Sequence, residues 1–590
     1  MDIKNLALLP TLLPLAASAI VLIAKAFLNE NAQKKAISLA GIVGLLLPWI
    51  PMALILPQIL AHEVPSFIFG GWRDGTGIYF KFDGLAWALN ALTLLICGGA
   101  WIYSRSSGPK GTAFAGMFLI QVASSCATMS TMDVFNLFVC LEVMGMASYV
   151  LIAQANTPGS YVASFTYLMS SAATMLLFLI GVYGLYRLTG DLNYDAIQTF
   201  LAQCSMQESR LAALCAICLI IPIVLRAAIM PLSGWLLLAH SQAPHPVSAI
   251  LSGVLLKVPL FALVRLLLIF PTGGALGSAI SFAGALGALL AVILALVQSD
   301  AKRLLAYHSI SQTGYVAAAL GASIAPLRSS NPELGLVLLV AAYLHALAHG
   351  IFKSLLFLSV GTLVDIEGQR NVYSIRNGVT LLKKAGDRYG LTGLSFAVGA
   401  LSIAAIPPFI GFSSKGYVTK SLAGNYRYVL LAVAAAFTVA SFIKLSRIFF
   451  SHSANQPGNT QVSLKPQPSE NTVLLTIGAS RIYAVLGLAI LCLAGGLFAP
   501  QLFRFGMLLF GSILPGPPLT ELSGAGAPKL FTQENLIQTA LSVTAGIFVF
   551  LLIISKTGRR ITHPIGNHVT SFETIFLGMG VALVTLALQI

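Results

Sequence analysis

The chain has 590 residues, of which 57% are hydrophobic and only 9% are charged, and its mean hydropathy is +0.87. Charged residues make up about a quarter of a typical soluble domain. This composition therefore excludes an ordinary soluble protein and predicts an all-α polytopic membrane protein. The formal net charge of +15 is explained by basic loops that orient the protein in the bilayer, and it does not indicate nucleic-acid binding.

Apolar stretches long enough to cross a bilayer recur along the whole chain. The first, around Leu6–Ala24, runs on into further spans without a small-residue cleavage site, so it is expected to stay as a helix. We predict about sixteen helices, near residues 5–25, 36–60, 84–104, 112–130, 132–154, 161–187, 210–237, 245–270, 275–297, 303–322, 334–362, 390–421, 426–450, 475–499, 533–555 and 570–588.

The loops after odd-numbered helices carry about twice as many Lys and Arg residues as the others, among them Lys34, Arg105, Lys302 and Arg303. By the positive-inside rule, this places the N-terminus outside a cell inner membrane. Alternating aromatic residues around Trp72 predict an outside hairpin within 61–83. The polar stretch 452–474 predicts an inside linker.

Several charged residues fall inside predicted helices, where each is a candidate for function because charge in the membrane costs at least about 2.5 kcal/mol. Glu142 and Lys257 lie about ten residues from either end of their helices, too deep to reach the headgroups easily. His345, His349 and Lys353 follow i, i+4, i+8 spacing, which places all three on one helix face.

Four further basic residues lie in or beside predicted spans: Arg226, Arg265, Lys415 and Lys444. For Arg265 the favoured interpretation is a side chain that reaches the headgroups, and for Lys444 this interpretation and a buried role stay open. Arg226 and Lys415 lie beside helix breaks and remain functional candidates.

Prolines predict two broken helices. Pro231 interrupts the seventh helix after Arg226, and Pro407 and Pro408 interrupt the twelfth before Lys415. Irregular backbone at membrane depth requires burial in protein or a watery cavity. A matched pair five helices apart is typical of two inverted five-helix repeats.

Lysine and histidine can both exchange protons in proteins, so a row of these groups suits proton transfer. A metal site at His345 and His349 lacks a nearby third ligand. Cys215 and Cys218 form a CxxC within an apolar helix, with no second pair, and are interpreted as packed small residues. The sequence shows no cofactor-binding motif and predicts no metal or cofactor in this chain.

The sequence resembles the antiporter-like subunits of respiratory complex I, Mrp-type cation/proton antiporters and energy-converting membrane hydrogenases. The resemblance covers about residues 85–450. It is carried by DVFNLFVCLEVMGMASYVL at 133–151, PLSGWLLLAHSQAPHPVSAILSGVLLKVPLFALVR at 231–265, QSDAKRLLAYHSISQTGYVAAALG at 298–321, HALAHGIFKSLLFLSVG at 345–361 and IPPFIGFSSKG at 406–416.

The resemblance implies about fourteen core helices and a role for each buried group. Glu142 would pair with the basic residue of the seventh helix, and Lys257 would relay protons to the centre. His345, His349 and Lys353 would form the bridge, and Lys415 would end the second half-channel.

The chain departs from this pattern at two site positions. Arg226 stands where the family has lysine, and arginine stays protonated, so it could hold Glu142 ionised but is a poor proton donor. His308 stands where a small hydroxyl residue is common, and its ring could hydrogen-bond or titrate. The linker 556–570 is too short for the long membrane-parallel helix of the longest complex I subunit of this type.

These observations predict a subunit that moves protons, or protons in exchange for sodium, within a respiratory, hydrogenase or Mrp-type membrane complex. Redox chemistry would belong to partner subunits. A stand-alone secondary transporter and a structural membrane subunit that has lost transport stay open as alternatives. The expected divisions are N-terminal flanking helices (1–104), a first repeat (105–270), a second repeat (271–450), and a linker with C-terminal flanking helices (451–590).

Overall fold

The computed structural model describes residues 6–69, 77–329, 332–451, 476–513 and 528–555, and these are almost entirely helical. The helices are α2 (Leu9–Phe27), α3 (Glu30–Gly41), α4 (Trp49–Leu60), α5 (Gly84–Ser104), α6 (Thr112–Ser130), α7 (Val134–Ala153), α8 (Pro158–Thr189), α9 (Tyr194–Leu201), α10 (Met206–Arg226), α11 (Gly234–Gln242), α12 (His245–Ile250), α13 (Lys257–Ile269), α14 (Gly273–Val297), α15 (Ala301–Leu327), α16 (Pro332–Glu367), α17 (Gly378–Lys384), α18 (Leu391–Ile403), α19 (Ile410–Ser421), α20 (Tyr426–Phe450), α21 (Ala479–Leu497), α22 (Ala499–Gly511) and α23 (Gln533–Ile554).

The protein spans the membrane many times. Thirteen helices in the described ranges are long and apolar enough to cross a membrane. The other expected spans are α15, which is more polar because it carries His308, Gln312 and three serines, and the broken pair α18–α19. The predicted helix 570–588 and the linker 452–474 lie outside the described residues. The predicted all-α membrane fold is confirmed.

Two π-helical turns lie within spanning helices. Ile42–Leu46 lies between α3 and α4, and Leu251–Leu255 lies between α12 and α13 and ends two residues before Lys257. Such turns add a residue to one helical turn and are frequent at functional sites.

The predicted hairpin is present. Strands β1 (Ser66–Ile68) and β2 (Tyr79–Lys81) pair antiparallel, with Phe67 opposite Phe80. Trp72, which the sequence places at its tip, lies outside the described residues.

Both predicted helix breaks are present. Residues 227–233 separate α10 from α11 and contain Pro231, while residues 404–409 separate α18 from α19 and contain Pro407 and Pro408. In each break the alanine two residues after the preceding helix adopts positive φ, +52° at Ala228 and +59° at Ala405. The two breaks therefore share a local conformation as well as a position in their halves.

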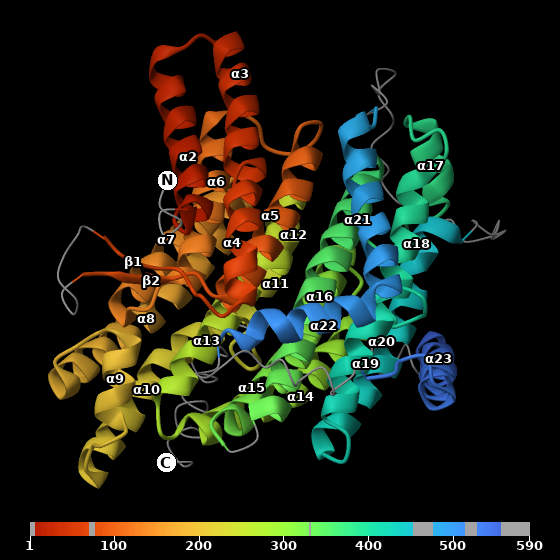
Figure 1. The fold of residues 1–590 in the computed structure, drawn as a ribbon. Coiled ribbons are helices and arrows are strands. Elements are labelled where there is room, and N and C mark those ends of the chain that lie inside the picture. The colour runs from red at the N-terminus through yellow and green to blue at the C-terminus, as the bar shows by residue number, and fades with distance from the viewer. Residues whose placement is uncertain (1–5, 70–76, 330–331, 452–475, 514–527, 556–590) are drawn as a thin grey trace.

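The long helix α16 lies at the centre, between the N-terminal helices on one side and α18–α20 with α23 on the other (Figure 1). Neighbouring α14 and α15 pack closely because glycines face each other: a Cβ on Gly314 would lie only 2.4 Å from the carbonyl oxygen of Gly284. Small residues are the usual way for membrane helices to approach so closely.

Three short helices were not among the predicted elements. The helices α9 and α17 have eight and seven residues. In Figure 1, α22 runs across the spanning helices instead of along them, and it packs on α5, α16 and α19. None of the three is long enough to produce a spanning pattern in the sequence.

Candidate functional site

A row of titratable side chains passes through the centre of the molecule. The central row consists of Lys257 on α13, Lys353, His349 and His345 on α16, and Lys415 on α19, and each residue is at most 4% exposed. The three α16 residues predicted to share one face are therefore all buried. In the described part of the chain, no carboxylate forms an ion pair with these lysines.

Two serines lie between the first two lysines. The Lys257 ammonium donates to the carbonyl oxygen of Ser252, in the π-helical turn before it. The Ser252 and Ser309 hydroxyls are 2.8 Å apart, and either one can donate. Ser309 donates to the Leu305 carbonyl oxygen at 3.3 Å, and Lys353 Nζ donates to the same oxygen at 2.5 Å. Hydroxyl and carbonyl groups thus bridge α13 and α16 through α15.

The other end of the row reaches the second helix break. The ring centroids of His349 and His345 lie 6.5 Å apart, and His345 Nδ1 lies 3.1 Å from the Ser414 hydroxyl oxygen. The next residue, Lys415, donates at 2.7 Å to the carbonyl oxygen of Ile403, the last residue before the break. The break frees this carbonyl from helical bonding, so the broken helix supplies the partner of Lys415.

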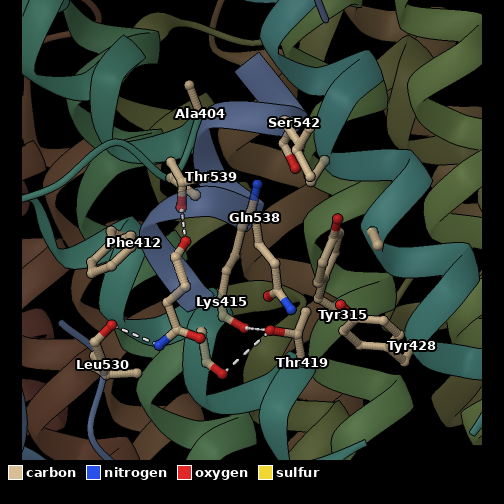
Figure 2. A pocket seen from close by; sticks show the side chains of 16 residues that line it. Tyr315, Ala404, Phe412, Lys415, Thr419, Tyr428, Leu530, Gln538, Thr539 and Ser542 are labelled. Atoms are coloured by element: carbon tan, nitrogen blue, oxygen red, sulfur yellow. Dashed lines mark hydrogen bonds between the residues drawn. The ribbon is translucent and has the colours of Figure 1, made fainter. Parts of the chain in front are cut away.

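Tyr315 of α15 lies between these two groups. Its ring centroid is 5.5 Å from that of His345 and 5.2 Å from Lys415 Nζ. Sequence reasoning missed this residue, since an aromatic side chain in an apolar helix is usually packing. Lys415 and Tyr315 also line a cavity that is bounded by α19, α20 and α23 (Figure 2).

The predicted pair of Glu142 and Arg226 is present. Arg226 Nη2 lies 2.5 Å from Glu142 Oε1, and Nη1 donates at 2.6 Å to the carbonyl oxygen of Leu141. Gly145 leaves room for the guanidinium, because a Cβ there would lie 2.6 Å from Nη1. Arg226 is fully buried, but the Glu142 side chain is 31% exposed at the edge of the chain. The carboxylate is therefore at mid-helix, as expected, and not enclosed by this chain.

His308 lies beside the row and not within it. Its Nε2 is 2.8 Å from the Ser441 hydroxyl oxygen of α20, and its ring packs 4.8 Å from that of Phe442. The buried imidazole thus links α15 to α20.

Arg265 does not reach toward the headgroups, so the interpretation favoured by the sequence is wrong. It is 8% exposed and forms two bonds, of 2.8 and 2.9 Å, to the carboxylate of Asp83, which is 1% exposed. It also donates to the Met129 carbonyl oxygen at 2.9 Å. Asp83 precedes Arg265 by 182 residues, so no local sequence pattern predicts this ion pair. Lys444 is buried as well, and its Nζ donates at 2.6 Å to the carbonyl oxygens of Leu296 and Gln298.

Lys302 was interpreted from the sequence as a loop charge, and this is also wrong. It is 2% exposed, and its Nζ donates at 2.5 Å to the Ala243 carbonyl oxygen. It lines a polar pocket of about 540 Å³ with His245, Asp365 and Arg370. Asp365 Oδ1 is 2.9 Å from His245 Nε2. A charge at the first turn of a helix resembles a loop charge, which explains the error.

Metal binding finds no support in the described residues, where no group of three or more His, Cys, Asp or Glu side chains could hold an ion. The two histidines of α16 lack the further ligands that zinc requires. The cysteines in the described part are free thiols.

Comparisons with known proteins agree with this geometry. Residues 131–443 match the family model described as NADH:quinone oxidoreductase/Mrp antiporter, transmembrane. The chain is 30% identical over 464 residues to NADH-quinone oxidoreductase subunit N of Desulforudis audaxviator, covering 76% of this chain and 88% of that protein. It is 29% identical over 544 residues to hydrogenase-4 component B of Escherichia coli, covering 88% of this chain and 76% of that protein.

The fold is also similar to that of a solved membrane complex. A chain in the structure of the Mrp complex from Dietzia sp. superposes with a TM-score of 0.74 at 22% identity, covering 89% of this chain and 99% of that one.

Proposed function

The chain belongs to the NADH:quinone oxidoreductase/Mrp antiporter transmembrane family, and on this premise we propose that it is a proton-translocating membrane subunit of a multi-subunit complex. The observation that carries the proposal is the central row, in which five buried side chains able to exchange protons follow one another from α13 to α19. A buried row of this kind is costly in a membrane and has no packing purpose.

The route we propose follows the central row. A proton passes from Lys257 to Lys353 by way of the Ser252 and Ser309 hydroxyls, with water joining each lysine to its neighbouring hydroxyl, because the lysines themselves bond the backbone carbonyl oxygens of Ser252 and Leu305. From Lys353 it crosses His349 and His345 to Lys415.

Water would complete the bridge. Both ring nitrogens of His349 and one ring nitrogen of His345 have no protein partner among the described residues. Buried polar atoms are normally satisfied by protein or by ordered water. We therefore expect hydrogen-bonded water along this face of α16.

Arg226 would act as a clamp on the carboxylate and not as a carrier. A guanidinium does not release its proton under physiological conditions, and this one holds Glu142 by a direct ion pair. The first half of the route would thus start at Lys257, with His308 supporting the second half through α20.

Neighbouring membrane subunits would cover Glu142. A carboxylate at mid-helix is poorly accommodated by lipid, and this one is partly exposed on the isolated chain. The relatives are named as subunits of an NADH-quinone oxidoreductase and a hydrogenase, so we propose partners of a respiratory, hydrogenase or Mrp-type complex. Redox centres would belong to those partners and not to this chain.

The proposed setting is a cell inner membrane with the N-terminus outside. Basic residues are frequent at the end of the molecule that carries Lys34, Arg105 and Lys110, which would be the inside. We also retain the divisions at residues 104, 270 and 450 as a proposal, since the two broken helices fall one in each proposed repeat.

The test replaces Lys353 by methionine, which keeps the length and removes the proton carrier. Proton movement is followed by fluorescence quenching in inverted membrane vesicles that contain the intact complex. We expect a rate at least about a hundredfold lower than that of the parental complex, the scale of one lost proton-transfer group. The control is Lys384→Met, on the exposed surface, which should leave the rate unchanged.

Two results would contradict the proposal: an unchanged rate in Lys353→Met with all partners co-purifying, or proton movement by the chain reconstituted alone. The co-purifying subunits also identify the complex. Iron–sulfur or nickel subunits indicate a redox pump, and small membrane subunits alone indicate an Mrp-type antiporter. Repeating the measurement with and without sodium separates proton pumping from exchange.

A further inference from the structure

A cavity of about 260 Å³ lies beside Lys415, and its outer wall is α23. Figure 2 shows the side chains of Gln538, Thr539 and Ser542 from α23 around this cavity, together with Lys415 and Thr419 from α19. The family model that matches the chain ends at residue 443. The wall therefore comes from a helix beyond the matched segment.

The inward face of α23 changes character along its length. Its first half presents Asn535, Gln538, Thr539 and Ser542 to the cavity. One turn further on, Gly546 packs directly on α20, where a Cβ would lie 2.6 Å from Val439 and 2.7 Å from the Ala436 carbonyl oxygen. Polar side chains thus stop where the two helices close together.

The outward face of α23 is largely apolar. Leu536, Ile537 and Phe548 are exposed, as expected for a side that meets lipid. Leu541 is also exposed but lies at the edge of this face, because it lines the cavity as well. The first half of the inward face of α23 is therefore polar, and it does not form the core of a helix pair. Polar groups in membranes face protein or water.

The cavity lies toward one end of α20. Its α20 lining is Tyr428, Ala432 and Ala435, in the half of α20 nearest its start at Tyr426. The close packing at Gly546 seals it toward the other end of α20. Under the proposed orientation, the Tyr426 end is the outside.

The hydroxyl groups of this wall are fixed by their own helices. Thr419 donates at 2.9 Å to the Lys415 carbonyl oxygen, and Thr539 donates at 2.9 Å to the Asn535 carbonyl oxygen. Each hydroxyl oxygen can still accept hydrogen bonds. With this volume, the cavity can hold several waters, since one water needs about 10–15 Å³ measured in this way.

We propose that α23 takes part in the ion path: Gln538 and Ser542 form the polar wall of this cavity and hold water that connects Lys415 with the Tyr426 end of the molecule. The occupant is water that takes a proton from Lys415, which rests on the function proposed above. The geometry assigns α23 a direct part in the ion path, where its sequence alone suggests one more membrane anchor.

The first test compares two cysteines placed two residues apart on α23, Ser542→Cys in the cavity and Ala540→Cys on the outward side, where the alanine is exposed and does not line the cavity. The intact complex in membranes is treated with a charged methanethiosulfonate, which reacts with thiols in contact with water. The parental chain with its seven native cysteines gives the background.

We expect Ser542→Cys to be labelled at least tenfold faster than Ala540→Cys, and labelling at position 542 to stop proton movement. Equal rates, or no labelling at position 542, would overturn this proposal and indicate a cavity filled by lipid chains.

The second test replaces Gln538 by leucine, which makes the wall apolar while keeping a similar size. Proton movement should fall at least fivefold, whereas Ile537→Ala on the outward face, which does not line the cavity, should leave it unchanged. An unchanged rate in Gln538→Leu would exclude this residue from the path. If the parental complex moves no protons, the proposed function fails, and the labelling contrast still decides whether the cavity holds water.

Discussion

Replacing Asp83 by asparagine should destabilise the protein strongly, because it breaks the ion pair that joins the start of α5 to α13. Asparagine keeps the shape of the side chain. It can also cap α5 as Asp83 does, by accepting the Ala86 N–H at 3.0 Å. The substitution therefore removes the charge and little else.

The expected loss is about 3–5 kcal/mol of unfolding free energy, the usual cost of leaving one member of a buried pair without its partner. The two Arg265–Asp83 bonds agree with this value, because hydrogen bonds to charged groups contribute about 1.5–3 kcal/mol each. Both side chains are less than a tenth exposed, so solvent gives little compensation.

Unfolding is measured by titrating the purified chain in mixed micelles with sodium dodecyl sulfate and following tryptophan fluorescence. The double variant Asp83→Asn/Arg265→Met should be more stable than Asp83→Asn alone, because it leaves no unpaired charge. A loss below about 1 kcal/mol in the single variant, the level of an exposed pair, would refute this reasoning. A double variant less stable than the single one would refute it too.

Arg226→Lys should make transport decline at alkaline pH, because a lysine can lose its proton and then no longer holds the Glu142 carboxylate. A rate profile between pH 7 and 10 that matches the parental one would contradict the clamp. Ser309→Ala should slow proton movement about a hundredfold by removing one transfer group, while Ser311→Ala, whose hydroxyl bonds the Ala288 carbonyl oxygen away from the row, should leave it unchanged. Gly314→Val should cost about 1–3 kcal/mol of unfolding free energy by overpacking the α14–α15 contact, and a smaller loss in the same titration would show that the two helices can separate at little cost.

The sequence predicts the deep charges well because the membrane makes them conspicuous. Lys257 and Lys353 stand in helices that are otherwise apolar, and helical spacing alone places the α16 groups on one face. Prolines mark both helix breaks. These signals are local, and the structure confirms the arrangement that they predict.

What the sequence does not predict depends on contacts between distant segments. Asp83 and Arg265 meet only through the packing of α5, α6 and α13. Ser252 and Ser309 are uncharged and look like ordinary packing residues until two helices bring their hydroxyls together. The polar face of α23 gains its meaning only from its position beside Lys415.

The serine bridge has a consequence for the energetics of the whole complex. The donor and acceptor of the bond between the Ser252 and Ser309 hydroxyls can exchange roles, and the pair contains no charged group that would fix the direction of proton movement. Under the proposed function, the direction of net flow would then be set by the driving force that the partner subunits supply, and a complex held against a sufficiently steep proton gradient would run backwards through the same residues.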